Sequence, residues 1–121
     1  MPQVLALVDD LFFQAKIVET AKHVGVQLRT CNTPDALLAE IAKGDARPRL
    51  VIVDLNARQN PLGAVEQMKA TAADIPLLGF LSHVQTDLAE KARAAGCHDV
   101  MPRSKFTRDL ATILAGAKSE S

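Results

Sequence analysis

Residues 4–13 read VLALVDDLFF: a five-residue apolar run, the two carboxylates Asp9 and Asp10, and three more apolar residues. The apolar run predicts a buried strand. A carboxylate in an apolar interior is costly unless a cation meets it. The acidic pair therefore either marks the point where the strand reaches solvent, or is placed to meet a metal ion or a phosphate-handling partner.

On either side of this acidic pair, short apolar runs alternate with segments of helical periodicity along the chain. The predicted strands are residues 3–8, 26–31, 49–55, 75–82 and 97–102, and the predicted helices are residues 12–25, 33–44, 62–73, 84–96 and 104–118. Strict alternation with short connections predicts parallel strands joined by right-handed crossovers. The fold class is therefore an open, doubly wound α/β sheet of five parallel strands, with helices on both faces.

Several helix ends and core faces can also be predicted. Thr33 and Ser104 are expected N-caps, with Pro34 at the first helical position. Glycines are expected where three helices end, at Gly25, Gly44 and Gly96. The expected buried stripes are Phe13, Ile17, Ala21 and Val24 on the first helix, and Phe106, Leu110, Ile113 and Ala117 on the last.

Composition limits the classes of function. The 121 residues fit one domain, expected over residues 1–118 with a disordered tail at 119–121. The 14 basic and 14 acidic residues balance, which argues against a general nucleic-acid or membrane-surface role. Cys31 and Cys97 are far apart and form no CxxC motif, and no signal peptide or membrane span is evident. We expect a cytoplasmic protein with two buried free thiols.

Ligands of such sheets bind outside the carboxyl ends of the strands, so the residues that follow each strand matter most. Asp54 ends the strand 49–55, Ser82 ends the strand 75–82, and Arg103 follows the strand 97–102. If strands 3–8 and 49–55 are neighbours, Asp9, Asp10 and Asp54 converge. Like charges at ~4 Å repel by on the order of 4 kcal/mol per pair, and Mg²⁺ would remove that cost.

Asp54 can then be considered as a nucleophile, because carboxylates form aspartyl-phosphate intermediates. Phosphoryl transfer asks a protein mainly for positioning and charge neutralisation, which a metal, a cation and a hydroxyl could supply here. The simpler alternatives are a solvated strand end for Asp9 and Asp10, and a loop-capping role for Asp54.

Several motifs resemble the CheY-like receiver domains of response regulators. The 44 positions between Asp10 and Asp54 are typical of that family, as are VIVDL (51–55), IPLLGFLS (75–82) and AAGCHDV (94–100). The resemblance covers essentially the whole chain. It implies a flavodoxin-like fold with strand order 2-1-3-4-5 and Asp54 as phosphoacceptor. It also implies Mg²⁺ bound by Asp9, Asp10, Asp54 and the backbone carbonyl of Asn56.

The chain departs from the family at several places. The family has a Lys followed by Pro after the fifth strand, where this chain has Arg103 and Ser104; Lys105 is the fallback cation. Spacing leaves the hydroxyl position between Ser82, which we prefer, and Leu81. Val100 replaces the aromatic residue that reports phosphorylation in the family. The loop NARQNPLG (56–63) lacks the usual Met-Pro and is one residue longer.

The leading hypothesis is a non-enzymatic receiver in a bacterial two-component phosphorelay. A histidine kinase or phosphotransfer protein would phosphorylate Asp54, and the face of the fifth strand and last two helices would bind a downstream partner, or a second copy in a homodimer. No output domain follows the last helix, so the chain is either a single-domain regulator or part of a longer protein.

The alternative is a pseudo-receiver that binds its partner without phosphorylation. A haloacid-dehalogenase-type phosphatase is disfavoured, because Asn56 stands where that family needs a second Asp. Flavin and dinucleotide binding are disfavoured because the chain lacks the glycine-rich phosphate loops.

Overall fold

The computed structural model describes residues 3–43, 48–58, 60–82 and 86–117. Strands and helices alternate strictly along the chain. The strands are β1 (Val4–Leu7), β2 (Leu28–Cys31), β3 (Leu50–Asp54), β4 (Leu77–Leu81) and β5 (Asp99–Pro102). The helices are α1 (Leu11–Val24), α2 (Pro34–Ala42), α3 (Pro61–Thr71), α4 (Thr86–Ala95) and α5 (Arg103–Gly116).

The five strands form one parallel sheet in the order β2-β1-β3-β4-β5. The predicted fold class and strand order are confirmed. After β2 the chain crosses back over β1 to form β3, so the strand order reverses between β1 and β3. Leu7 of β1 lies opposite Val53 of β3, which brings the ends of these two strands together.

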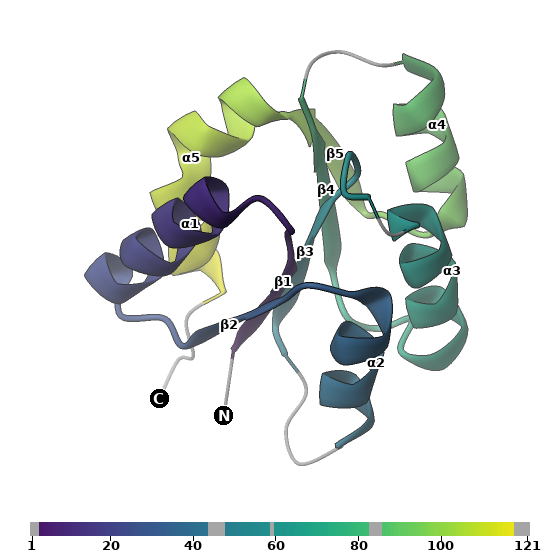
Figure 1. The fold of residues 1–121 in the computed structure, drawn as a ribbon, viewed down its shortest axis with the longest axis horizontal. Helices are drawn as coiled ribbons and strands as arrows, with labels where there is room; N and C mark the ends of the chain where they lie inside the picture. The colour runs from purple at the N-terminus through teal and green to yellow at the C-terminus, as the bar shows by residue number, and fades with distance from the viewer. Residues whose placement is uncertain (1–2, 44–47, 59, 83–85, 118–121) are drawn as a thin grey trace.

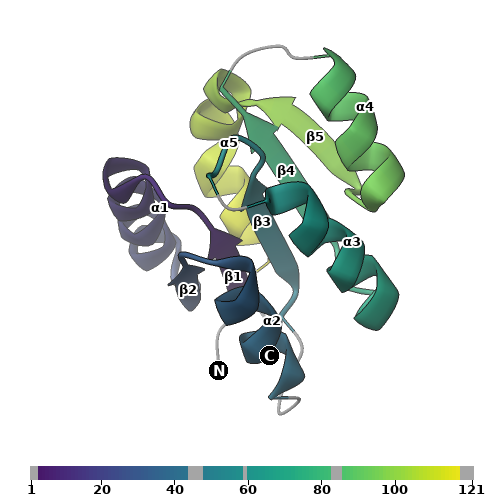
Figure 2. The ribbon, with the colours of Figure 1, turned by 45° about the vertical axis from the view of Figure 1, so that its right-hand side comes forward.

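The helices form two layers, one on each face of the sheet. Figures 1 and 2 show α1 and α5 on one face and α2, α3 and α4 on the other. Side chains alternate along each strand: Leu5 and Leu7 pack towards α2–α4, whereas Val4 and Ala6 pack towards α1 and α5. Strands covered on both faces explain the nearly continuous apolar runs in the sequence.

Local sequence sets most of the helix ends. Gly25 ends α1 in the left-handed conformation, with φ of 81°, and Thr33 caps α2 by accepting the Ala36 N–H at 3.1 Å. Ser104 is not the N-cap of α5, so that prediction was wrong. The helix begins at Arg103 after the extended Pro102, which makes no side-chain cap bond.

The buried stripes agree with the predictions at most positions, but Val24 and Ile113, which were expected to be buried, are only partly buried against the core. Phe13, Ile17 and Ala21 are buried on α1, and Phe106, Leu110 and Ala117 are buried at the end of the chain. Leu114, which is fully buried, was missed. Gly44 and residues 118–121 lie outside the described residues, so the predicted helix end and tail stay predictions, as does the domain boundary.

Within the described ranges, none of the helices combines the length and apolar character that crossing a bilayer would require.

Candidate functional site

Asp54 is the last residue of β3, and its side chain is buried at the edge where the strand order reverses. It is 2% exposed and is the one buried charged residue among those the structure describes. Its Oδ1 accepts the Asn56 backbone N–H at 2.9 Å. Burial raises the pKa of the Asp54 carboxyl, against the lowering effects of the Asn56 N–H and the Arg103 charge; Asp9 and Asp10 add to the rise.

Asp10 follows β1 and caps α1. Its Oδ1 accepts the backbone N–H groups of Phe12 at 3.0 Å and Phe13 at 3.2 Å. Such a cap satisfies two of the four N–H groups that a helix start leaves without partners. Asp10 therefore has a structural role that the sequence analysis did not identify, although an Asp before a helix is the usual signal for it.

Asp9 connects the end of β1 to the loop after β3. Its Oδ2 accepts the Arg58 backbone N–H at 3.0 Å. Neither Asp9 nor Asp10 is fully exposed, which disfavours a plain solvated strand end. The structure thus brings Asp9, Asp10 and Asp54 to one edge of the sheet, close enough for the acidic pair to act on the Asp54 pKa.

Arg103, at the start of α5, is the cation beside Asp54. Its Nη2 lies 3.8 Å from Asp54 Oδ2, and its side chain is 32% exposed. Lys105, the fallback, pairs instead with Asp109, at 3.4 Å. The spacing argument that placed Arg103 rather than Lys105 at this position agrees with this arrangement.

The end of β4 supplies a hydroxyl residue. Leu81 is 2% exposed and packs in the core under α2–α4, whereas Ser82 is exposed at the strand end. The Ser82 backbone N–H donates to Asn56 Oδ1 at 2.5 Å, which joins the loops after β3 and β4. Of these two residues, Ser82 is the one that can present a hydroxyl at this edge.

Val100 of β5 is buried in the same core, 7% exposed. A valine here cannot turn between a buried and an exposed position as a large aromatic ring can.

The donors at this edge fit Mg²⁺ by their chemistry, because Mg²⁺ prefers carboxylate and carbonyl oxygens. In the described ranges, no group of three or more His, Cys, Asp or Glu side chains is arranged to hold a metal ion. Mg²⁺ usually takes only one or two carboxylates and keeps several waters, so three are not required. Asp9 and Asp10 each have only one oxygen hydrogen-bonded by described residues.

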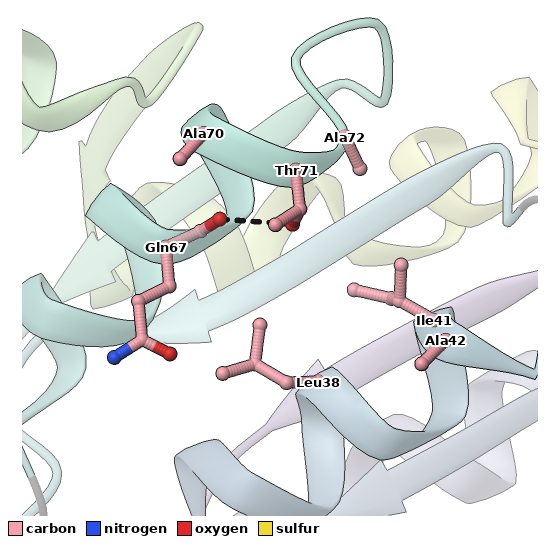
Figure 3. A pocket seen from close by; sticks show the side chains of 7 residues that line it. All are labelled: Leu38, Ile41, Ala42, Gln67, Ala70, Thr71 and Ala72. Atoms are coloured by element: carbon pink, nitrogen blue, oxygen red, sulfur yellow. Dashed lines mark hydrogen bonds between the residues drawn. The ribbon is translucent and has the colours of Figure 1, made fainter.

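A pocket of about 480 Å³ lies elsewhere, between the carboxyl-terminal ends of α2 and α3. Figure 3 shows the side chains that line it: Leu38, Ile41, Ala42, Gln67, Ala70, Thr71 and Ala72. The Thr71 hydroxyl is already used, since it donates to the Gln67 carbonyl at 2.9 Å. No lining residue carries a charge, so this pocket has no group suited to phosphate or metal chemistry.

Comparisons with known proteins agree on the fold. No protein-family model matches the sequence, and no similar sequence is found among curated proteins. The solved receiver domain of NtrX from Brucella abortus is 21% identical with a TM-score of 0.79, over 94% of this chain and 96% of that one. CheY4 of Vibrio cholerae, a chemotaxis response regulator, is 18% identical with a TM-score of 0.81, over 98% and 99%.

The phosphorylated cyanobacterial phytochrome response regulator RcpA is 16% identical with a TM-score of 0.77, over 93% of this chain and 88% of that one. Against the longer NtrX chain solved with ADP, the match covers 94% of this chain but 25% of that one. The chain therefore has the CheY-like receiver fold, and spans about a quarter of the longer NtrX chain. The resemblance drawn from the sequence is confirmed at the level of fold.

Proposed function

We propose that the protein is a signalling receiver that accepts a phosphoryl group on Asp54. The observation that supports this most directly is the buried Asp54 carboxylate, held between the acidic pair and the Arg103 guanidinium at the topological switch of the sheet. Ligands of open α/β sheets bind at this place. The proposal rests on these side chains as well as on the shared fold, because fold alone does not define function.

In the proposed reaction, an Asp54 oxygen attacks the phosphorus of a phosphohistidine in the donor protein. A P–O bond forms, the P–N bond breaks, and the departing imidazole nitrogen keeps the electron pair and takes a proton. Arg103 and Ser82 would meet the oxygens of the transferred group, since phosphoryl transfer depends on charge neutralisation and positioning.

Mg²⁺, when bound, would be held by one or two of the carboxylates of Asp9, Asp10 and Asp54 together with the Asn56 carbonyl, and would supply positive charge next to the phosphoryl oxygens. The repulsion among the three carboxylates is the physical reason to expect a cation here.

Leu11 and Phe12 offer a surface for the donor protein. They are 73% and 91% exposed and directly follow Asp10, beside the proposed site. The face formed by α4, β5 and α5 stays our proposal for the downstream partner or a second copy of the chain.

The test is incubation with acetyl phosphate and Mg²⁺, followed by intact mass and peptide mapping. We expect one added phosphoryl group on Asp54, and none in Asp54→Asn or in a sample treated with EDTA. A matched control is Asp35→Asn, which removes a carboxylate on the exposed surface of α2 and should leave phosphorylation unchanged.

A second function, phosphorylation-independent partner binding, is favoured by Arg103 and Val100 at the positions of the family's Lys and aromatic reporter. Absence of modification under saturating acetyl phosphate and Mg²⁺ would support this pseudo-receiver and reject the first proposal.

Addition of beryllofluoride with Mg²⁺, followed by NMR, is an independent test. Chemical-shift changes confined to residues around Asp54 would mean that the pocket is competent but transmits no signal. Changes that extend to Val100 and α5 would mean that the protein signals.

A further inference from the structure

In the part of the chain that the structure describes, the contacts that hold the Arg103 guanidinium at the site are with aromatic rings rather than hydrogen bonds. Its Cζ lies 4.8 Å from the centroid of the Phe13 ring and 5.8 Å from that of Phe80. Its Nε is buried and has no hydrogen-bond partner among the described residues. The 3.8 Å between Nη2 and Asp54 Oδ2 is too long for a hydrogen bond.

The Phe13 ring is itself fixed by two neighbours. Its centroid lies 5.1 Å from that of Phe80 and 5.9 Å from that of Phe106, and Phe80 and Phe106 stack at 4.5 Å with 6° between their planes. All three side chains are at most 9% exposed. The Asp10 cap also holds the Phe13 backbone N–H, so the acidic pair and the ring are fixed together.

This arrangement keeps Arg103 near Asp54 without closing on it. An Arg and a carboxylate left to themselves favour a bidentate pair, which would occupy both carboxylate oxygens. Stacking on an aromatic face offers the planar guanidinium an alternative that leaves its N–H donors unused.

We propose that Phe13 is a positioning residue: its ring holds the Arg103 guanidinium beside Asp54, with N–H donors ready for the phosphoryl oxygens. The expected effect on phosphorylation rests on the proposed function. The contact between the Phe13 ring and the Arg103 guanidinium can be tested without phosphorylation. It explains how an arginine, longer and bulkier than lysine, can serve at this position.

The main variant is Phe13→Leu, which keeps an apolar side chain and removes the ring. Its matched control is Phe106→Leu, which removes a ring from the same cluster; among the described residues the cation–π contacts of Arg103 are with Phe13 and Phe80, not with Phe106. The first readout is ¹⁵N relaxation of the Arg103 Nε–H group, which needs no phosphodonor. We expect backbone-like rigidity in the wild type and in Phe106→Leu, and free surface-like motion in Phe13→Leu.

The second readout is the rate of Asp54 phosphorylation by acetyl phosphate with Mg²⁺. We expect Phe13→Leu to slow it about three- to tenfold, the range of a partly desolvated cation–π contact, and Phe106→Leu to change it less than twofold. In an Arg103→Ala background, where no cation remains for the ring to hold, Phe13→Leu should have no further effect on the rate.

The relaxation measurement decides the inference even if Phe13→Leu does not fold: a mobile Arg103 Nε–H in the wild type overturns it. Equal relaxation and equal rates in Phe13→Leu and Phe106→Leu overturn it too. If Arg103 is rigid in the wild type and mobile in Phe13→Leu but Asp54 is never phosphorylated, the proposed function fails while the positioning of Arg103 by Phe13 stands.

Discussion

Asp10 shows how one side chain can serve both the helix and the site. Its carboxylate caps the first turn of α1 and also lies at the edge that holds Asp54. A neutral amide can accept the same two hydrogen bonds, because asparagine is as good an N-cap as aspartate. Substitution can therefore separate the hydrogen bonds from the charge.

We expect Asp10→Ala to lower the free energy of unfolding by about 1 kcal/mol, the usual cost of losing an N-cap. The free energy of unfolding of Asp10→Asn should lie within a few tenths of a kcal/mol of the wild-type value. The same variant should bind Mg²⁺ more weakly, because it has lost a carboxylate charge. Urea denaturation with EDTA measures the first effect, and the rise in midpoint on adding Mg²⁺ measures the second. Equal destabilisation by both variants would mean that the charge, not the cap, stabilises α1.

Asp54 gives a prediction about pH. Burial raises its folded-state pKa above the unfolded value, so the folded state binds this proton more tightly than the unfolded chain does. The stability that this provides is fully present below the unfolded pKa and is lost as the pH rises through the folded pKa.

Without Mg²⁺, Asp54→Asn should therefore be more stable than the wild type at neutral pH, and the difference should shrink as the pH falls towards the unfolded pKa. Urea titrations across this range test it, with Glu66→Gln on the exposed surface of α3 as the control for removing one charge. If the wild type is more stable than Asp54→Asn at neutral pH, the attraction between Arg103 and the Asp54 carboxylate outweighs the cost of burying that carboxylate.

At the scale of single elements, all ten helices and strands were predicted from apolar periodicity, and the misses are at their ends. Ser104 was a sound N-cap candidate, but the observed N-cap is the extended Pro102, two residues earlier. Hydrophobic spacing identifies an element because burial acts along its whole length. A terminus depends on a few backbone angles, which the sequence determines only weakly.

The start of α3 depends on such angles. Asn60 adopts φ of 42° and caps the helix through Oδ1, which accepts the Gly63 N–H at 3.2 Å. A Cβ at Gly63 would lie 2.3 Å from Asn60 Nδ2, so an alanine there displaces the capping side chain.

In a helix, alanine normally stabilises by roughly 0.5–1 kcal/mol relative to glycine. We expect Gly63→Ala to bring no such gain in free energy of unfolding, because the new Cβ displaces the capping side chain. In an Asn60→Gly background, where no capping side chain remains and glycine tolerates the positive φ, the same substitution should stabilise by about that amount. Urea denaturation of the four proteins gives the comparison. Equal effects of Gly63→Ala in both backgrounds would show that the cap does not set the sign.

At the scale of the whole molecule, the sheet topology brings residues that are far apart in the sequence to one edge of the sheet. The convergence of Asp9, Asp10 and Asp54 could be predicted because parallel strands end at one edge, once β1 and β3 are neighbours. The contact of Arg103 with Phe13 could not, because it depends on side-chain directions set by packing across the fold. The sequence thus predicts the location of the site but not how its cation is held.

Topology also predicts that the sheet unfolds as one unit. Cys31 ends β2 at one side of the sheet, and Cys97 precedes β5 at the other. Both are at most 6% exposed and pack in the core shared with α2–α4. Burial raises the pKa of each thiol to about 11, so at pH 8 only about one in a thousand is the reactive thiolate.

Native protein should therefore react very slowly with iodoacetamide, and the thiols should become reactive only on unfolding. In Cys31→Ala and Cys97→Ala, each retaining one thiol, labelling against urea should follow the same midpoint as circular dichroism of that variant. The two thiols report on opposite ends of the strand order, so coincident midpoints would mean that the two edges of the sheet unfold together. Labelling of Cys31 well below the midpoint would show that β2 opens separately, and would contradict a single cooperative sheet.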